Sequence, residues 1–494
     1  MHRFNVLLTR LILLFSAVVL IHSSSGGSNH NDNEDDGHMV LTDQVWTVSW
    51  NAPFLSSSSG YGSEATSFLI GLNQTLPELK EKGDHWQIGA GLAHADSIDH
   101  KYMNGLPTDL EDLFFKASGL QHIMDPDFTV VVCHSEPGAW SVPTPLYESP
   151  WPCPPPIQDN NKKKWKKLVG RTMFETDRLP NGWDDRLNQM DEIWVPTHHH
   201  KQIFENGGVT KPVVVVGQGI DVDYWDPHEQ EPLPFDKIDK HSRCSESDYK
   251  FLSVFKWESR KGPDILLPSF FNAFPGRKGA CLIIVTSLYH RDAELVVDEV
   301  KAYWKQHLQA TTSSTPNQQA ARPEVKGVIL LTGLKLKALV RLYNSVDAFV
   351  LPSRGEGWGR PYMEAMAMGL PVIATNWSGP TEFLNEDNGY LLPIRGLVNA
   401  NLDSFPGHKW ADPDPAILTK LMKHLSENPN EGKVKGQRAR KDAVEKWSNL
   451  ALSRDVAREL QRLAGRSSDN VGGGSTSTTN EKVVNPQSND ADEL

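Results

Sequence analysis

Six short apolar segments alternate with helix-forming segments in the second half of the chain. They are Tyr249 to Phe255, Cys281 to Thr286, Val328 to Leu331, Ala348 to Leu351, Val372 to Thr375 and Tyr390 to Leu392. Each is mainly apolar, as expected for a strand that is buried on both faces of a parallel sheet. Helical segments such as Leu334 to Tyr343 lie between them. This alternation predicts a doubly wound parallel α/β sheet.

The first half of the chain shows the same kind of pattern. Apolar strand segments occur at Val45 to Trp50, Phe128 to Cys133 and Val213 to Val216. With 494 residues the chain is long enough for two domains and tails. We predict a targeting segment (1–25), a disordered acidic linker (26–39), a first domain (40–228), a linker (229–248), a second domain (249–465) and a disordered tail (466–494).

The stretch from Leu351 to Leu384 carries the strongest chemical signal. A strand runs into a loop with three glycines, then a helix that ends at Gly369, then the strand Pro371 to Thr375; the loop glycines are Gly355, Gly357 and Gly359. Such glycines let the backbone approach a ligand and point its N–H groups inward. The N-terminus of the helix favours bound oxygens or anions.

Two carboxylates accompany this loop. Glu356 lies in the loop and Glu364 lies in the helix, eight positions later. Carboxylates accept hydrogen bonds well from sugar hydroxyls, so the pair can reach two parts of one polar ligand. The alternative is a solvated glutamate in a turn and a second glutamate favoured by the helix dipole.

This stretch resembles the donor-site signature of retaining GT-B glycosyltransferases of glycosyltransferase family 4. Their pattern is Glu, seven residues and Glu, then a helix, Gly-x-Pro-Val and a Gly-x-x-Glu loop, which is Gly379 to Glu382 here. The resemblance spans about residues 45–465 and is strongest over 251–390. It implies a GT-B fold, in which two doubly wound Rossmann-like domains face an interdomain cleft. It also implies a hexosyltransferase that uses a nucleotide-diphosphate sugar, expected to be a UDP-sugar, with retention at the anomeric carbon.

The resemblance also implies roles for individual residues. Glu364 would hold the nucleotide ribose, and Glu356 would lie at the donor sugar. The backbone at Gly357, Trp358 and Gly359 would meet the sugar or phosphate, and Thr332 and Gly333 would contact the nucleobase. No metal ion or other cofactor is required in this picture.

Two lysines follow the first strand of the second domain. Lys256 ends the strand, and Lys261 precedes Gly262 at the turn before a helix. Lysines here are commonly solvated, but at this junction they suit a diphosphate. The family has Arg, four residues and Lys-Gly at this point. Lys256 replaces the arginine, which keeps the charge and loses the bidentate fork. We expect both lysines and the helix amides to stabilise the departing diphosphate.

The first domain offers weaker candidates. Gly60 and Gly62 lie in a turn before a helix that opens near Glu64, the layout of a ligand-binding loop. His134 follows a buried strand at its carboxyl end, where the resemblance implies a histidine near the donor sugar; a structural histidine is the alternative. The segment around Met173 to Trp183 resembles the acceptor side of the family.

Metal and nucleic-acid binding are not favoured. His198 to His200 are consecutive, and consecutive residues on a helix point in different directions. The Asp-x-Asp strings at Asp125 and Asp412 are built around proline in loop-like sequence. A formal charge of −12 argues against a general nucleic-acid binder. The basic run at residues 162–167 reads as a solvated face, with a membrane-surface patch as the alternative.

The chain ends predict a compartment. The apolar run Leu11 to Ile21 is shorter than the roughly twenty residues of a membrane span, and Ser23 and Ser25 offer a cleavage site. A cleaved signal peptide is favoured over a short signal-anchor. The final four residues, 491–494, resemble a Lys-Asp-Glu-Leu retention signal. We expect the lumen of the endoplasmic reticulum, with the Golgi or another endomembrane as the alternative.

Sequons and cysteines bear on the same question. Asn73 and Asn376 begin glycosylation sequons, and we expect only Asn73 to be modified, because a glycan on Asn376 would obstruct the donor loop. Cys133 and Cys281 lie in strand patterns, and Cys153 and Cys244 lie in loops. The two loop cysteines are one possible pair, but the sequence alone does not decide the pairing.

Two other classes of function are compatible with these motifs. One is a nucleotide-sugar hydrolase or epimerase, and the other is a catalytically silent sugar-binding protein. The presence of both glutamates and both lysines argues against the silent protein. The acceptor, whether a glycan, a lipid or a small molecule, is not specified by the sequence. A membrane partner is expected only if the N-terminal segment is retained.

Overall fold

The computed structural model describes residues 44–53, 60–92, 108–119, 124–140, 152–157, 163–240, 243–277, 279–287 and 327–466. The predicted targeting segment and acidic linker lie outside these residues, as does the predicted C-terminal tail apart from its first residue, Arg466, which pairs with Asp84. Within the described part of the chain, no helix is both long and apolar enough to cross a membrane.

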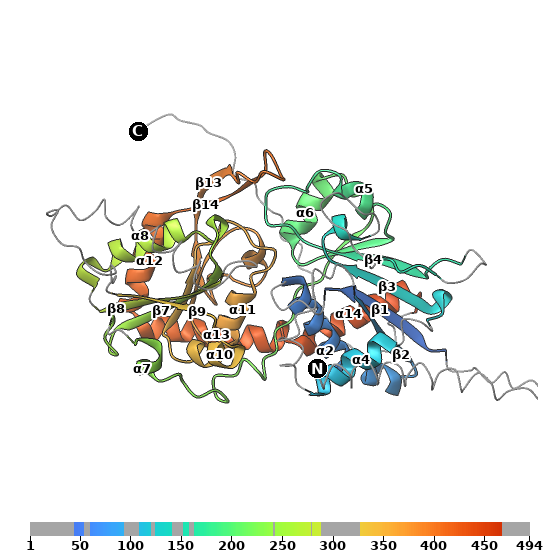
Figure 1. Cartoon of the computed structure of the whole chain (residues 1–494), viewed down its shortest axis with the longest axis horizontal. Helices are drawn as coiled ribbons and strands as arrows, with labels where there is room; N and C mark the ends of the chain where they lie inside the picture. The colour runs from blue at the N-terminus through green and yellow to red at the C-terminus, as the bar shows by residue number, and fades with distance from the viewer. Residues whose placement is uncertain are drawn as a thin grey trace, which may run out of the picture.

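The first domain is built on a six-stranded parallel sheet (Figure 1). Its strands are β1 (Trp46–Ala52), β2 (Trp86–Leu92), β3 (Thr129–His134), β4 (Lys167–Arg171), β5 (Glu192–Val195) and β6 (Val213–Val215), in the order β2-β1-β3-β4-β5-β6. Its helices are α2 (Gly60–Glu81), α4 (Thr108–Gly119), α5 (Trp183–Leu187) and α6 (His198–Asn206). Every neighbouring pair of strands is parallel, as the apolar segments predicted.

The second domain repeats this design. Its sheet contains β7 (Tyr249–Lys256), β8 (Ala280–Ser287), β9 (Val328–Thr332), β10 (Ala348–Leu351), β11 (Val372–Thr375) and β12 (Tyr390–Leu392). The order is β12-β11-β10-β7-β8-β9, again all parallel. Its helices are α7 (Phe235–Ile238), α8 (Pro263–Ala273), α10 (Leu336–Tyr343), α11 (Arg360–Ala367), α12 (Pro415–Glu427) and α13 (Pro429–Lys446). The predicted strands of this domain are confirmed to within two residues.

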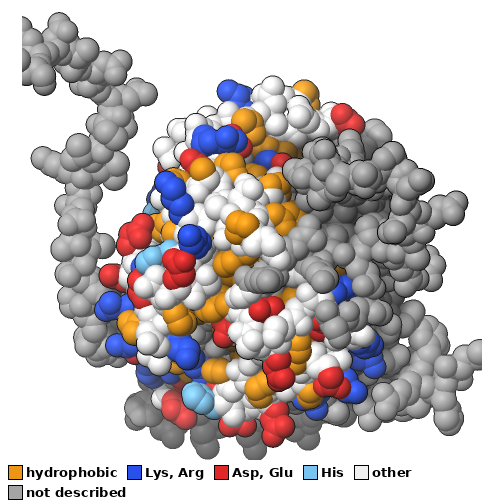
Figure 2. All heavy atoms as spheres, turned by 90° about the vertical axis from the view of Figure 1, so that its left-hand side faces the viewer, with side chains coloured by type: hydrophobic (Ala, Val, Ile, Leu, Met, Phe, Trp, Pro, Cys, Tyr) orange, Lys and Arg blue, Asp and Glu red, His pale blue; other side chains and the backbone are white. Residues whose placement is uncertain are grey.

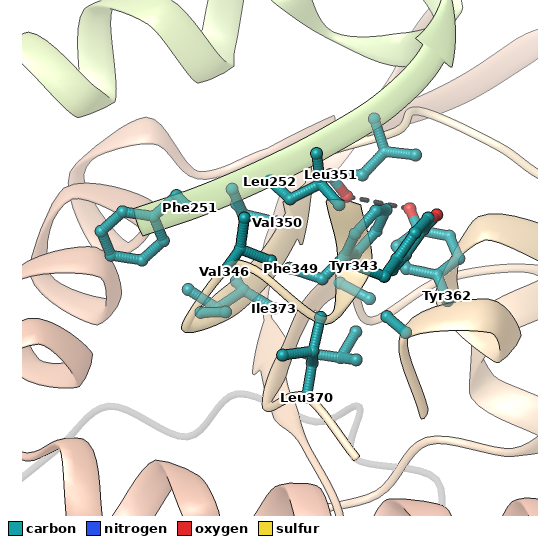
Figure 3. Close-up of a cluster of buried hydrophobic side chains, with 14 of the residues drawn as sticks. Phe251, Leu252, Tyr343, Val346, Phe349, Val350, Leu351, Tyr362, Leu370 and Ile373 are labelled. Atoms are coloured by element: carbon teal, nitrogen blue, oxygen red, sulfur yellow. Dashed lines mark hydrogen bonds between the residues drawn. The ribbon is translucent and has the colours of Figure 1, made fainter. Parts of the chain in front are cut away.

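Burial explains the continuous apolar composition of these strands. Phe251, Phe349 and Ile373 have no exposed surface, because helices cover both faces of the sheet. Figure 3 shows this core, in which two tyrosine rings pack against Phe349. The Tyr343 ring lies parallel to it at 5.9 Å, and the Tyr362 ring meets it edge-on at 5.7 Å.

The order of the second sheet reverses between β7 and β10. The chain runs outward from β7 through β8 to β9, then returns to β10 and runs the other way to β12. Ligands of open α/β sheets bind in the crevice outside the carboxyl ends of the strands at such a reversal. The loops after β7 and β10 carry the predicted lysines and Glu356.

An antiparallel hairpin, β13 (Ile394–Asn399) and β14 (Lys409–Pro413), was not predicted. Most of β13 is exposed, so it lacks the apolar pattern of a buried strand. The turn of the hairpin reaches the first domain, where Phe405 contacts Phe174 with ring centroids 4.8 Å apart. The hairpin therefore forms part of the domain interface.

The last helix, α14 (Asn449–Leu463), returns to the first domain. Its apolar face, including Val456 and Leu460, belongs to the first domain's core. The Ser453 hydroxyl lies 2.5 Å from the Thr75 hydroxyl on α2. In Figure 1 the chain passes from α13 beneath the second domain to α14 beside α2. The second domain was predicted to extend to residue 465, but its last helix, α14, packs with the first domain.

Two disulfides join strands to loops. Cys133 at the end of β3 pairs with Cys153, and Cys281 in β8 pairs with Cys244. The possible pair between the two loop cysteines is therefore wrong. The loop that contains Cys153 returns to β3, where the Cys153 N–H donates to Trp140 O at 2.9 Å, whereas Cys244 lies in the interdomain linker. No cysteine of the chain is left unpaired.

The end face of the second domain carries no single charge sign. Figure 2 shows Lys and Arg interspersed with Asp and Glu, between small apolar areas.

Candidate active site

The loops after β7 and β10 are bound to each other by their backbones. The Arg354 N–H donates to Arg260 O at 2.6 Å. Gly262 has a φ of 70°, and a Cβ there would lie 2.3 Å from Pro352 O. Only glycine fits this left-handed, crowded position, so the glycine of the Lys-Gly pair is required by the turn that begins α8. This turn fixes the backbone of Lys261 at the reversal of the sheet.

Lys261 and Glu356, predicted from different loops, meet at this point. The Lys261 Nζ donates to both carboxylate oxygens of Glu356, at 2.6 and 2.8 Å. The side chains are only 11% and 8% exposed. Burial acts to raise the pKa of Glu356, but Lys261 and Arg260 hold it below its ordinary value. The Glu356 N–H donates to the Ser378 hydroxyl at 3.0 Å, which fixes the loop from the other side.

Arg260 also belongs to this cluster, although it was not among the predicted site residues. Its Nη1 donates to Gly355 O at 2.6 Å and approaches Glu356 at 3.3 Å, and its Nη2 donates to Glu258 at 2.8 Å. These carboxylates raise the pKa of Arg260 against the effect of burial. Its place directly before Lys261 was the signal that could have identified it.

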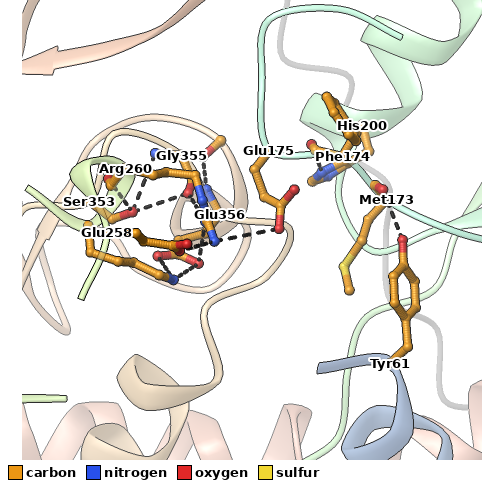
Figure 4. Close-up of polar contacts among 12 residues, drawn as sticks. Tyr61, Met173, Phe174, Glu175, His200, Glu258, Arg260, Ser353, Gly355 and Glu356 are labelled. Carbon is orange, nitrogen blue, oxygen red and sulfur yellow. Dashed lines mark hydrogen bonds and ion pairs between the residues drawn. The ribbon is translucent and has the colours of Figure 1, made fainter. Parts of the chain in front are cut away.

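The cluster balances positive and negative charge. Its cations are Lys256, Arg260 and Lys261, and its carboxylates are Glu175, Glu258 and Glu356. Burial and then repulsion by Arg260 lower the pKa of Lys261, while Glu356 opposes this. Figure 4 shows Glu175 reaching toward Arg260 from the first domain, and the closest N–O distance is 3.8 Å. The site therefore receives side chains from both domains.

Glu364 lies on α11, half-buried, with a tyrosine as its partner. The Tyr343 hydroxyl donates to Glu364 Oε2 at 2.9 Å. Burial raises the pKa of Glu364, and Arg360 and this hydrogen bond oppose the rise. Tyr343 was not among the predicted site residues, because its place on α10 gives no sequence signal for contact with α11.

Two of the three loop glycines pack against residues of the first domain, in addition to facing the expected ligand site. A Cβ on Gly355 would lie 2.1 Å from Glu175 O, and a Cβ on Gly357 would lie 2.4 Å from Met173 Sδ. Gly359 has a φ of 102° and caps α11. The first two glycines thus let the segment around Met173 to Glu175 pack on the loop, a reason that the sequence did not reveal.

Trp358 does not present its side chain to the site. It is 2% exposed and packs against Phe383 and Trp447. Its predicted role in binding is therefore limited to its backbone. Thr332 ends β9, and Gly333 follows with a φ of 66°, so both lie at the carboxyl edge of the sheet as predicted.

His134 lies at the end of β3 as predicted, but it is fully buried. Trp50 Nε1 donates to His134 Nδ1 at 3.0 Å, which leaves the proton on Nε2, and Nε2 lies 3.2 Å from Glu64 Oε2. Burial lowers the pKa of His134, and Glu64 opposes this. Because both ring nitrogens face protein, this geometry does not support a catalytic role for His134.

Glu64 connects His134 to Arg171. Both side chains are 1% exposed, and Arg171 Nε donates to Glu64 Oε1 at 2.9 Å. Burial alone would raise the pKa of Glu64, but Arg171 and His134 lower it to about 2. Gly60 and Gly62 form the first turn of α2 beside this network, and residues 54–59 of the predicted loop lie outside the described residues.

The remaining motifs have structural partners. The three histidines of α6 contact different groups: His198 bonds Glu382 at 2.9 Å, His199 packs on Trp377, and His200 bonds Phe174 O at 2.9 Å. Lys163 pairs with Asp125 and Asp127. Asp412 lies in β14 and not in a loop as predicted, and Asp414 caps α12.

Comparisons with known sequences agree with these observations. Residues 279–402 match the family described as Glycosyl transferases group 1. The chain is 30% identical to spore coat protein SA of Bacillus subtilis (strain 168) over 143 residues, which are 28% of this chain and 34% of that protein. It is 27% identical to the lipopolysaccharide core biosynthesis mannosyltransferase LpsB of Rhizobium meliloti (strain 1021) over 199 residues, 38% and 49% of the two chains. The matches thus span at most about half of these relatives.

Solved structures show the fold. HepE of Anabaena, in complex with UDP and glucose, superposes with a TM-score of 0.51 at 14% identity, over 84% of this chain and all of that one. A glycosyltransferase from Rickettsia africae ESF-5 gives 0.53 at 14% identity, and sucrose-phosphate synthase from Thermosynechococcus elongatus gives 0.53 at 12%, each over 85% and 99% of the two chains. The chain has the GT-B fold, with two doubly wound Rossmann-like domains.

Proposed function

We propose that the protein is a glycosyltransferase that moves a sugar from a nucleoside diphosphate sugar, a UDP-sugar, to an acceptor with retention of anomeric configuration. The observation that carries this proposal is the contact between Lys261 and Glu356 at the reversal of the second sheet, with Glu364 on the following helix. A diphosphate needs buried cations, and a sugar and a ribose need carboxylates. The matched family segment contains both glutamates. A mannosyltransferase among the relatives and the UDP in HepE support the same class.

Donor binding exchanges partners within the charged cluster. In the structure, Lys261 Nζ donates to Glu356 Oε1 at 2.6 Å. A nucleotide sugar brings a diphosphate for Lys261 and hydroxyl donors for Glu356, so both groups remain satisfied after the exchange. This matters because an unpaired charge in a site this buried is costly.

The charge that develops during transfer falls on the diphosphate. The bond between the anomeric carbon and the β-phosphate oxygen breaks, and the acceptor oxygen bonds that carbon from the leaving-group side. The acceptor proton passes to the departing diphosphate. Lys261, Lys256 and Arg260 stabilise this charge in a partly buried site. No metal ion is needed in the proposal, because these protein cations supply the positive charge.

We place the enzyme in the endoplasmic reticulum lumen, with a signal-anchored endomembrane location as the alternative. Both disulfides support an oxidising compartment. The predicted signal segment and the final residues point the same way. The acceptor is a glycan, a lipid or a small molecule of that compartment.

The test is calorimetric titration with UDP, GDP and ADP, followed by kinetics with the matching nucleotide sugars. Glu364→Gln should weaken nucleotide binding roughly tenfold to a hundredfold, because it removes a hydrogen bond to a charged group worth about 1.5–3 kcal/mol. Turnover at saturating donor should persist, since this bond forms in ground and transition states alike. Lys261→Ala should lose about 10²–10³ in turnover, because the diphosphate gains charge only as the sugar leaves.

Glu427→Gln, an exposed carboxylate on α12, is the matched control. The proposal fails if none of the three nucleotides binds the wild-type protein, or if Glu364→Gln and Lys261→Ala behave like the control. Incubation with nucleotide sugar alone separates a transferase from a hydrolase, since only the hydrolase releases free sugar at the full rate without an acceptor.

A further inference from the structure

Tyr343 is fully buried at the end of α10, and its ring has two aromatic neighbours. Phe349 lies parallel to it at 5.9 Å with an interplanar angle of 9°, and Trp225 meets it edge-on at 5.2 Å. Figure 3 shows the ring beside Phe349 in the core of the second domain. Close packing on two sides fixes the ring, so the position of its hydroxyl is also fixed.

That hydroxyl donates to Glu364 Oε2 at 2.9 Å. Burial raises the pKa of Glu364 toward the neutral form, and the Tyr343 hydrogen bond acts against this rise, together with the Arg360 charge. Burial and the nearby carboxylate raise the pKa of Tyr343 well above its ordinary value, so the hydroxyl keeps its proton. A protonated tyrosine that faces a carboxylate can only act as donor in this bond.

The bond has a geometric consequence for Glu364. A carboxylate is planar, so tethering Oε2 to a fixed hydroxyl also sets the direction of Oε1. The hydrogen bond also favours the ionised form, against the effect of burial, and the ionised form accepts hydrogen bonds at both oxygens. A hydroxyl ligand then meets a carboxylate that is already oriented, and less side-chain freedom is lost on binding.

We propose that Tyr343 is the positioning residue for the donor ribose: its hydroxyl orients Glu364, and Glu364 in turn binds the ribose hydroxyls. This inference rests on the proposed function, because the ribose role of Glu364 belongs to it. Tyr343 itself does not touch the donor. Its contribution should therefore appear in nucleotide affinity and vanish when either Glu364 or the ribose hydroxyls are removed.

A second tyrosine in the same core provides a control that distinguishes positioning of Glu364 from a purely structural role of the hydroxyl. Tyr362 is also fully buried and also packs on Phe349, and its hydroxyl donates to Leu351 O at 2.8 Å. Replacing either tyrosine by phenylalanine removes one buried hydroxyl and leaves the ring. Only Tyr343→Phe removes a bond to Glu364.

The experiment titrates wild type, Tyr343→Phe, Tyr362→Phe, Glu364→Gln and the double variant Tyr343→Phe/Glu364→Gln with UDP and with 2′,3′-dideoxy-UDP by calorimetry. GDP and its dideoxy form replace them if wild type prefers guanine. Tyr343→Phe should weaken UDP binding roughly threefold to tenfold, less than Glu364→Gln, because it removes the orienting bond and not the acceptor itself. Tyr362→Phe should bind UDP like wild type.

Three further readouts distinguish positioning from stability. The dideoxy nucleotide should bind wild type and Tyr343→Phe equally. The double variant should bind UDP no more weakly than Glu364→Gln alone, since the tyrosine acts through the glutamate. The loss of UDP affinity in acid should begin at higher pH in Tyr343→Phe. Without the Tyr343 hydrogen bond, the effect of burial is less opposed and the pKa of Glu364 rises further.

Several outcomes overturn the inference while leaving the proposed function intact. They are a Glu364→Gln defect without a Tyr343→Phe defect, equal losses in Tyr343→Phe and Tyr362→Phe, and additive losses in the double variant. If Glu364→Gln binds UDP like wild type, the ribose role of Glu364 is wrong and the inference fails with it; the proposed function fails as well only if Lys261→Ala also behaves like the control.

Discussion

Replacing Gly355 by alanine tests whether the two domains must close on the donor loop. The added Cβ would lie 2.1 Å from the Glu175 carbonyl oxygen and 3.0 Å from the Trp377 ring. Neither the Glu175 backbone nor the loop that contains Gly355 can move easily. Glu175 O belongs to backbone, and Arg260 holds the loop by donating to Gly355 O at 2.6 Å. The substitution therefore pushes the first domain away from the loop instead of moving one side chain.

The size of the displacement sets the expected effect. Cβ atoms essentially never approach a carbonyl oxygen closer than 3.0 Å, so the two segments must separate by about 0.9 Å, the difference between 3.0 and 2.1 Å. A misplacement of about 1 Å can cost roughly a hundredfold in rate. We expect turnover to fall by about that factor. Nucleotide affinity should stay near wild type, because Glu364 and Lys261 lie entirely within the second domain.

Gly357→Ala is the matched control. Its Cβ would meet Met173 at the Sδ, 2.4 Å away, and a methionine side chain can rotate aside. The assay compares turnover, UDP affinity and the radius of gyration from small-angle scattering with and without UDP. Gly355→Ala should be slower and more extended than Gly357→Ala. If Gly355→Ala turned over like wild type, closure of the first domain onto this loop would not be part of the reaction.

Three other predictions follow from the same structure and sequence. Glu64→Gln leaves the buried Arg171 without its carboxylate partner, so the free energy of unfolding, measured by urea titration, should fall by about 3–5 kcal/mol. The control is Glu78→Gln, at an exposed ion pair with Arg454, which should lower the free energy of unfolding by less than about 1 kcal/mol. The pKa of Glu64 falls from 4.5 to about 2 on folding, so the ionised carboxylate stabilises the folded protein fully above pH 4.5 and loses this effect as the pH falls toward 2. If Glu64→Gln lost stability in acid as steeply as wild type does, this account would be contradicted. Extending the chain beyond Leu494 should cause secretion from cells, and unchanged retention would favour a signal-anchor. Mass spectrometry of active protein should find no glycan on Asn376, which is exposed directly after β11; a glycan there would refute its placement at the donor loop.

Much of the fold was predictable because buried parallel strands have a distinctive composition. Ala348–Leu351 is apolar at every position and Val372–Thr375 at every position but its last, and the structure confirms both to the residue. β2 was missed because its sequence, WQIGAGL, contains two glycines, which weaken the strand signal. β13 was missed because it is exposed and has no buried face to mark it.

The partners of Cys133 and His134 could not be predicted from the residues that surround them in the sequence. Sequence placed Cys133 and His134 correctly at the end of a buried strand. It gave no basis for the partner of either residue, since Cys153 and Glu64 are 20 and 70 positions away. Whether a histidine at a strand end faces a ligand or the interior depends on which side chains the neighbouring helix and strands bring to it. Here Trp50 and Glu64 occupy both ring nitrogens.

The sequence alone was enough to predict which loops hold the candidate site. In a parallel sheet every strand ends at the same edge, so a motif that follows a strand is placed at that edge by topology. Lys261, Glu356 and Glu364 were therefore identifiable from their positions along the chain. Only the tertiary structure decided their partners. Tyr343 reaches Glu364 because α10 packs beside α11, and Glu175 reaches Arg260 because the first domain lies against the donor loop. Contacts of this kind depend on packing between elements far apart in the chain, and no local pattern of residues encodes them.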